Sequence, residues 1–183
     1  IPAEVYDKRG RATASRTRVL GTDDWLIEVY FYDEKGRLVQ KSANNIQNSA
    51  VADIQTIQYD WEGKMNSVRK VHSGAEQITT EDIYHYDNRG LLTHISQVAG
   101  NNPEQDIVHY ELGQVIEKNL HGSTEFLQSV DYTYHIRGWL KSINGLSMEE
   151  ESNAIETDFY GMEFQYENSA ENQYDGNISS ISW

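Results

Sequence analysis

The sequence predicts an all-β fold, in which successive antiparallel hairpins form a twisted, curved open sheet. Three observations carry this prediction. A motif of the form Tyr-Asp-x-x-Gly returns along the chain at spacings of 24 to 27 residues. Segments rich in Ile, Val, Thr and Tyr flank each copy with rough alternation, which is typical of β-strands. No sustained 3.6-residue period, which would indicate amphipathic helices, is present.

The copies of the motif define the expected hairpins, because internal repeats indicate the architecture before any local pattern does. Their tyrosines are Tyr6, Tyr32, Tyr59, Tyr86, Tyr110 and Tyr134. Their glycines are Gly10, Gly36, Gly63, Gly90, Gly113 and Gly138. A weaker seventh copy, QYDGNIS, covers residues 173–179. We therefore expect residues 1–183 to form a single array of about six or seven hairpins, which is part of a longer chain.

The turn at each hairpin tip follows from the chemistry of aspartate and glycine. The aspartates of the motif are Asp7, Asp33, Asp60 and Asp87. An aspartate that begins a turn accepts hydrogen bonds from backbone N–H groups ahead of it. A glycine three residues later adopts the left-handed conformation that closes the loop with a bulge. The stretch from Asp33 to Gly36 is therefore predicted to be a hairpin tip.

This turn fixes which residues face each other across the hairpin. It places Tyr32 opposite Leu38, and the same count gives the pairs Tyr59 with Met65, Tyr86 with Leu92, and Tyr134 with Leu140. The copy at Tyr110 is one residue shorter, and a two-residue Leu112-Gly113 loop places Tyr110 opposite Val115. An aromatic side chain thus meets an aliphatic one each time, and such cross-strand pairs contribute about 0.2–1 kcal/mol each.

The opposite face of the predicted sheet is not purely polar. It carries the apolar residues Trp25, Ile27, Val29, Phe31, Ile83, Ile107 and Ile116. Both faces are therefore expected to be partly covered, or one face lines an enclosed space. A terminal strand would leave unpaired backbone groups at its edge, which also indicates a longer array.

The repeated motif resembles the YD repeat, also called the RHS repeat, whose signature is roughly Y-D-x-x-G-R-L. The stretch from Tyr32 to Leu38 matches every fixed position, whereas Lys64 and Leu91 replace the arginine of two other copies and His135 replaces an aspartate. The phrases YTYHIRGWLKSIN and FYGMEFQY also look like RHS-type proteins of the Bacteroidetes. The resemblance implies a spiral of β-hairpins that sometimes closes into a shell around a toxic C-terminal polypeptide. Other members of the family are adhesive, and carbohydrate binding is attributed to the repeats.

We therefore expect a non-catalytic structural segment of a larger protein that is secreted or lies on the bacterial cell surface. The expected partners are adjacent repeats or domains of the same polypeptide, together with glycans or an enclosed C-terminal domain. The alternative is a carbohydrate-binding or adhesion module that uses exposed aromatic side chains, and a glycoside hydrolase is a remote alternative. The RHS-associated core with its self-cleaving acidic residues does not occur in the chain, so cleavage and toxicity are not expected.

The composition of the chain argues against several classes of partner and site. The net charge of −14 disfavours nucleic acid, because phosphates would be repelled. No stretch has the apolar length of a membrane span, and the chain has no cysteine for disulfides or thiolate ligands. We expect no cofactor, since no glycine-rich phosphate loop is present.

Candidate sites are few. The six histidines show no metal-ligand spacing, and the hairpin register places His94 opposite Tyr84 with His85 on the other face, so no metal site is expected. No catalytic residue is assigned, because the carboxylates form no recognisable pair. The segment Leu146–Ile155 could form a short helix or offer a calcium site through its glutamates. Trp61, at a predicted tip, is the one candidate ligand contact.

Overall fold

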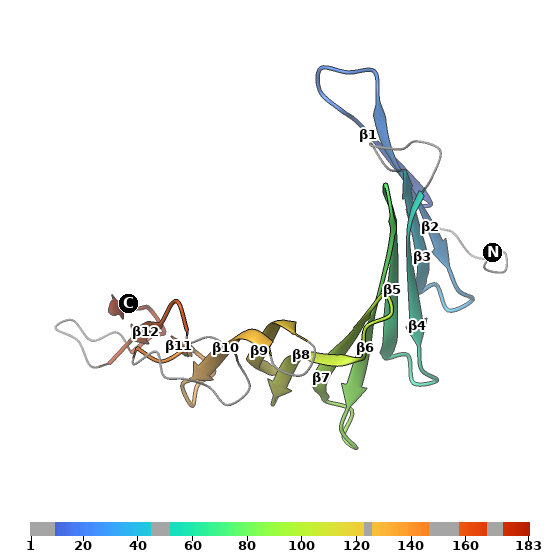
Figure 1. Cartoon of the computed structure of the whole chain (residues 1–183). Coiled ribbons are helices and arrows are strands. Elements are labelled where there is room, and N and C mark those ends of the chain that lie inside the picture. Colours follow the sequence, from blue (N-terminus) through green and yellow to red (C-terminus); the bar gives the residue numbers. More distant parts are fainter. Residues whose placement is uncertain (1–9, 45–51, 123–125, 147–157, 168–173) are drawn as a thin grey trace. The chain divides into compact units, whose positions relative to one another are not determined.

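The computed structural model describes residues 10–44, 52–122, 126–146, 158–167 and 174–183. These ranges contain strands and turns but no helix, which confirms the predicted all-β fold (Figure 1). The strands are β1 (Ala14–Arg18), β2 (Trp25–Tyr32), β3 (Leu38–Asn44), β4 (Ala52–Tyr59), β5 (Met65–Ser73), β6 (Gln77–Tyr86), β7 (Leu92–Ala99), β8 (Gln105–Glu111), β9 (Gln114–Gly122), β10 (Phe126–Tyr134), β11 (Leu140–Ile143), β12 (Met162–Gln165) and β13 (Ser180–Ser182). Tyr6, Asp7 and all of the Leu146–Ile155 segment after Leu146 lie outside the described residues.

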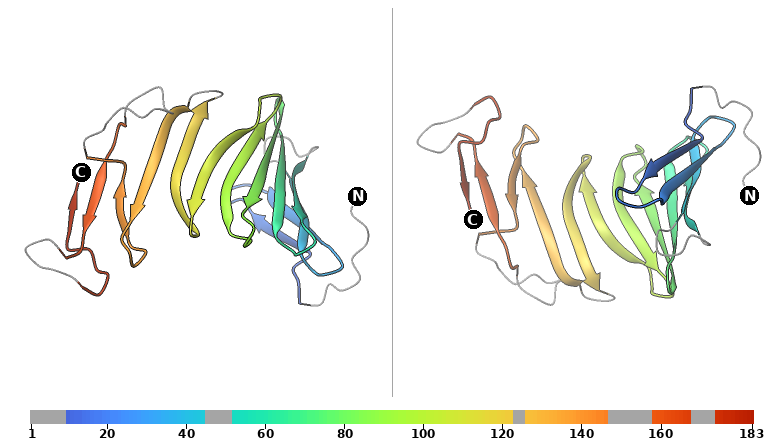
Figure 2. Two further views of the ribbon diagram at one scale, coloured as in Figure 1. Left: turned by 90° about the horizontal axis from the view of Figure 1, so that it is seen from below. Right: turned by 90° about the horizontal axis from the view of Figure 1, so that it is seen from above.

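Each strand is hydrogen-bonded to the next one along the chain, so the order in the sheet is the order in the sequence. The sheet is open, with β1 and β13 at its two ends. The chain packs as two compact units, Ile1–Tyr84 with Gln97–Glu104 and His85–Ser96 with Gln105–Trp183. Within the second unit, Figure 2 shows β9 to β13 as successive neighbours in the warm colours of the bar.

Four of the five predicted pairs across the hairpins are observed. Tyr32 lies opposite Leu38, and the other observed pairs are Tyr59 with Met65, Tyr110 with Val115, and Tyr134 with Leu140. In the remaining hairpin the N–H of Asp87 donates to the Leu91 carbonyl, as the N–H of Asp33 donates to the Arg37 carbonyl. The turn geometry that the motif predicts is therefore the one that the chain adopts.

A β-bulge follows the tip, and the sequence analysis did not place it inside the second strand. In the first complete copy Tyr32 pairs with Leu38 but Phe31 pairs with Gln40, so Val39 is an extra residue. The same shift leaves Asn66, Ile116 and Lys141 as extra residues in their hairpins. A bulge moves every later residue of that strand by one position relative to its partner.

Few of the described side chains on the sheet are buried. Val68 is the only buried hydrophobic residue within the described ranges. The other buried side chains there are polar or charged, namely Ser67, Asp82, Ser96, Asn119, Ser129, Asn144 and Asp158. Ordinary domains bury apolar side chains between two layers, whereas in each unit of this chain the strands are supported mainly by their neighbours in the sheet. No helix in the described ranges has the length and hydropathy of a membrane span.

Candidate functional site: the contacts between hairpins

The hairpin tip is held by the aspartate of the motif, as the sequence predicts. Asp33 Oδ1 accepts the backbone N–H of Arg37 at 2.8 Å, and its Oδ2 accepts the Arg37 guanidinium at 2.7 Å. Asp60 and Asp87 accept the corresponding backbone N–H groups at 2.8 Å. Gly36 has a φ of 77°, which a side-chain-bearing residue adopts only with strain.

These bonds change the acidity of the tip carboxyls. Backbone hydrogen bonding from Leu91 holds the pKa of Asp87 below its ordinary value, with a further contribution from Arg89. Burial raises the pKa of Asp33, but the hydrogen bonds and charge of Arg37 outweigh it, so that the net shift is downward. Both carboxyls are therefore held in the charged form that the turn requires.

The tyrosine of the motif makes a contact that the sequence analysis missed. Its hydroxyl donates to a backbone carbonyl of the preceding hairpin, at the position that Leu holds in the motif. The observed bonds are Tyr32 to Ala12 at 2.7 Å, Tyr59 to Leu38 at 2.9 Å, Tyr134 to Val115 at 2.8 Å, and Tyr166 to Leu140 at 2.7 Å. Each tyrosine thus packs within its own hairpin and also ties it to the hairpin before it. We call this bond the tyrosine clip.

A second contact between hairpins involves the glycine. The residue after the glycine of one hairpin lies over the glycine of the next, where a β-carbon would otherwise sit. The pairs are Arg11 over Gly36, Arg37 over Gly63, Gln114 over Gly138, and Trp139 over Gly176. The same side chain can also cover the next tyrosine, as the Arg37 guanidinium does 4.4 Å from the Tyr59 ring centroid. Glycine is therefore required for its backbone conformation and also for the space that it leaves.

The last hairpin differs from the expected seventh copy. Tyr174, the tyrosine of QYDGNIS, is 64% exposed, and Tyr166 makes the tyrosine clip in its place. Gln165 pairs with Ser180, and Gly176 has the left-handed backbone of the motif glycine. The seventh hairpin therefore takes its tyrosine from one segment and its glycine from another. Only the observed contact, and no local sequence motif, could identify Tyr166.

The histidine register that the sequence predicts is wrong. His94 does not lie opposite Tyr84 with His85 on the other face. The rings of His85 and His94 are instead stacked, with their centroids 4.0 Å apart. The bulge at Val39 shifts the equivalent strand of its hairpin by one residue, and the same shift at Thr93 would bring His94 opposite His85. Within the described ranges, no group of three or more His, Cys, Asp or Glu side chains is arranged to hold a metal ion.

The candidate ligand contact Trp61 lies at the tip between β4 and β5 and is 85% exposed. Its neighbour Glu62 forms an ion pair with Lys64, at a distance of 2.5 Å. The exposed indole thus stands beside a local charge pair, and whether it contacts a ligand stays a prediction.

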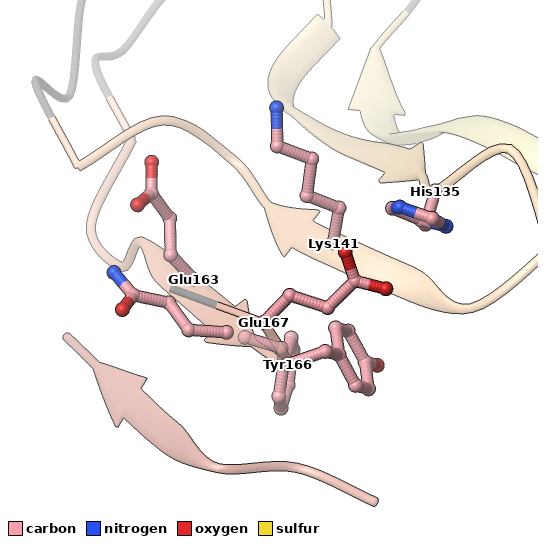
Figure 3. Close-up of a pocket in the computed structure, with 7 residues that line it drawn as sticks. His135, Lys141, Glu163, Tyr166 and Glu167 are labelled. Carbon is pink, nitrogen blue, oxygen red and sulfur yellow. The ribbon is translucent and has the colours of Figure 1, made fainter. Parts of the chain in front are cut away.

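A pocket of about 250 Å³ lies beside β11 and β12 in the second unit (Figure 3). Its lining residues are His135, Lys141, Glu163, Phe164, Gln165, Tyr166 and Glu167. In Figure 3 the Glu163 side chain extends to the upper left and the Glu167 side chain to the right, so their carboxylates diverge. The Tyr166 hydroxyl is engaged by the Leu140 carbonyl. The pocket thus offers an aromatic wall and several polar groups, but no pair of carboxylates facing each other.

A buried carboxyl lies ahead of β12. Burial raises the pKa of Asp158, and the nearby charge of Asp131 raises it further. Asp158 is 8% exposed. The backbone N–H of Asp131 donates to the Asn144 side-chain oxygen at 2.7 Å, so Asp131 is fixed by the adjacent strand. Such a carboxyl favours its protonated form relative to an exposed one.

The remaining glycines of the motif share the left-handed backbone of Gly36. Gly10, Gly90, Gly113 and Gly138 all have positive φ, as the tips require.

No protein-family model matches the sequence, and a search of curated proteins finds no significant match.

Proposed function

We propose that the chain is a non-catalytic section of the β-sheet scaffold of a larger secreted or bacterial cell-surface protein of the YD-repeat (RHS-repeat) type. The observation that carries this proposal is the repeated tyrosine clip. The same hydrogen bond joins neighbouring hairpins at four places, from Tyr32 to Tyr166. A contact that recurs with each hairpin stabilises an array and favours no particular substrate.

The proposed mechanism is enclosure and presentation of other domains. Val68 is the only buried hydrophobic residue in the described ranges, and many larger apolar side chains there are only half covered. Exposed apolar surface of this extent is typical of surfaces that contact another polypeptide. Adjacent repeats of the same polypeptide are therefore the first expected partner, and an enclosed C-terminal domain is the second.

The unpaired edge of β13 supports the proposal that an adjacent repeat is a partner. Ile178 holds the position of Leu38 in the last hairpin and is 48% exposed, and Ile181 in β13 is 42% exposed. A further hairpin placed against β13 would bring its tyrosine to the Ile178 carbonyl, in the manner of the four observed clips. It would also cover the backbone groups that an edge strand leaves unpaired.

The proposal is tested by adding a hairpin. A second copy of residues 123–146 is appended after Trp183, and amide hydrogen exchange is measured across β13. We expect the β13 amides to exchange about tenfold more slowly, because the added strand pairs with them. The matched control carries Tyr→Phe and Gly→Ala at the copied positions of Tyr134 and Gly138, and should give less protection. Equal exchange with and without the added hairpin would contradict the proposal.

The alternative is glycan binding, and two observations support it. Trp61 is a nearly fully exposed aromatic residue at a tip, and the pocket beside β12 combines Phe164 and Tyr166 with polar side chains. Aromatic rings with polar neighbours are suited to stack on sugars. A glycan array with the parent chain and the Trp61→Ala and Phe164→Ala variants tests this function. Binding that both variants retain would argue against either aromatic site.

The glycoside hydrolase is the least supported function. A glycosidase needs two carboxyls that flank the scissile bond, whereas the carboxylates of Glu163 and Glu167 diverge in Figure 3. Polysaccharide hydrolysis that disappears in the Glu163→Gln or Glu167→Gln variant would nevertheless establish an enzyme.

A further inference from the structure

Three histidine rings form a column on one face of the second unit, and neither the turns nor the tyrosine clips require it. The rings of His85 in β6 and His94 in β7 are nearly parallel, with an angle of 6° between their planes and 4.0 Å between their centroids. His109 in β8 extends the column, with its centroid 5.9 Å from that of His94 and an interplanar angle of 20°. The column therefore crosses three consecutive strands.

Hydroxyl groups hold the first two rings in place. His85 Nε2 lies 2.8 Å from Ser96 Oγ, and Ser96 is completely buried. His94 Nδ1 lies 3.1 Å from Thr93 Oγ1. The Thr93 hydroxyl also lies 3.0 Å from the His85 carbonyl and donates to it, which fixes the bulge beside the column. The rings are thus held by their surroundings in the stacked arrangement.

Carboxylates approach the other end of the column. Asp106 Oδ1 in β8 lies 3.8 Å from His94 Nε2, and Glu117 Oε2 in β9 lies 3.8 Å from His109 Nε2. From β10, Ser129 Oγ donates to Glu117 Oε1 at 3.1 Å, and Asp131 lies opposite Glu117.

Two further charged groups lie close in sequence to the column but have other partners. Lys118 of β9 is placed over the Tyr132 ring, and Arg89 at the β6–β7 tip is bound to Asp87. Asp106 and Glu117 are thus the carboxylates that the structure places beside His94 and His109.

Protonation of the whole column is opposed by the stacking itself. Imidazole rings gain a positive charge within the range of about pH 5 to 8. Two imidazolium rings in face-to-face contact repel each other, and carboxylates at one end offset only part of that repulsion. We propose that the column is a pH-sensitive joint, closed at neutral pH and opened in mild acid, which loosens β7 from its neighbours.

The other hairpins provide the contrast. The positions equivalent to His85 and His94 hold Gln58 and Ser67 in one hairpin and Thr133 and Ser142 in another, as their cross-strand pairs show. Those side chains carry no charge between about pH 5 and 8. Of the three hairpins, only the one with His85 and His94 can therefore form such a joint. With both rings charged, the closed form holds two positive charges in stacked contact and the opened form does not, so acid favours opening and stability falls as pH falls.

The experiment is amide hydrogen exchange of the full chain at pH 7.5 and 5.5, corrected for the intrinsic exchange rate. We expect the protection of amides 92–96 to fall by about tenfold between these conditions, the factor that corresponds to an interaction of one pK unit. The carboxyls of ordinary aspartates and glutamates titrate mainly below this window. Protection that does not change with pH would overturn the proposal.

The decisive variant is His85→Gln with His94→Ser, which installs the residues of the Gln58 and Ser67 pair in the equivalent place. It should abolish the pH response, whereas His72→Gln, at an exposed ion pair with Asp53, should retain it. If the double variant does not fold, His94→Ser alone must remove most of the response, because His94 is the middle ring and neither His85 nor His109 then has a stacked partner. A response that survives in the variant measured would overturn the proposal.

Discussion

The first complete hairpin, β2–β3, and the last, β12–β13, achieve the same contacts with different tips. Residues 33–37 separate Tyr32 from Leu38, whereas residues 167–177 separate Tyr166 from Ile178. The first tip is held by an aspartate that accepts hydrogen bonds from Arg37. In the last, Asp175 accepts the Asn177 backbone N–H at 3.2 Å, two residues ahead instead of four.

What the two hairpins share is their contact with the preceding hairpin. Tyr32 and Tyr166 both make the tyrosine clip, and Gly36 and Gly176 both lie beneath a side chain of the preceding hairpin. The length and chemistry of the tip can therefore vary, while the clip and the glycine cannot be altered without loosening neighbouring hairpins.

The largest expected effect comes from the glycine of the last hairpin. Gly176→Ala forces a side chain into a backbone with φ 94° and against the Trp139 ring, 3.0 Å from the new β-carbon. We expect a loss of about 2–4 kcal/mol in the free energy of unfolding, from strain and overpacking together. Urea denaturation measures it. Gly113→Ala has a φ of 83° but nothing within 4 Å, so its loss should be about 1–2 kcal/mol. Equal losses would contradict the role of the covering side chain.

The next effect tests the clip that the β4–β5 hairpin makes to β2–β3 and the clip of the last hairpin. Tyr59→Phe and Tyr166→Phe each remove one hydroxyl and leave a carbonyl without that donor. A loss of about 1 kcal/mol is expected for each variant, the typical value for such a hydrogen bond. Tyr160→Phe is the matched control, since Tyr160 is 44% exposed and outside the motif. Thermal or urea unfolding of all three variants gives the comparison, and an unchanged stability of both clip variants would refute it.

Acid should destabilise the hairpin tips that contain the motif aspartate before it destabilises a tip that lacks it. The pKa of Asp87 is lowered chiefly by the Leu91 backbone hydrogen bond, and the pKa of Asp33 is lowered on balance by Arg37 despite its burial. A lowered pKa contributes stability above the ordinary value of 3.8, and this contribution is lost as pH falls through the folded pKa. NMR at pH 2–5 should show the Gly36 and Gly90 amides losing protection before that of Gly138, whose N–H donates to the carbonyl of His135 where the other tips have aspartate. Simultaneous loss would contradict the prediction.

The smallest effect is expected at the exposed tip. Trp61→Ala should change the free energy of unfolding by less than about 0.5 kcal/mol, because the side chain is 85% exposed. Urea denaturation checks this value, with Val68→Ala as a buried control that should lose clearly more. A large loss of unfolding free energy for Trp61→Ala would mean that the indole packs against the fold and is not free to bind a ligand.

The features that the sequence predicts are those determined within one hairpin. The turn at Asp33 and Gly36 and the pairing of Tyr32 with Leu38 depend on residues close together in the chain. The bulge at Val39 has no such signature, because an ordinary β-branched residue occupies the extra position. The stacking of His85 on His94 follows from a bulge and was therefore missed with it.

The contacts between hairpins could not be predicted for another reason. The tyrosine clip from Tyr59 to Leu38 requires the offset between adjacent hairpins, which no single copy of the motif contains. Tyr166 was missed because its segment lacks both the aspartate and the nearby glycine. The pocket beside β12 depends on the same offset, and its lining residues carry no pattern of their own.

The placement of one side chain above the glycine of four hairpins also bears on how such a chain changes over generations. Because every repeat meets its neighbour through the same small set of atoms, duplication or deletion of a whole unit regenerates a matching junction. Gene segments can therefore lengthen or shorten the protein in steps of two strands, without redesign of a shared interior.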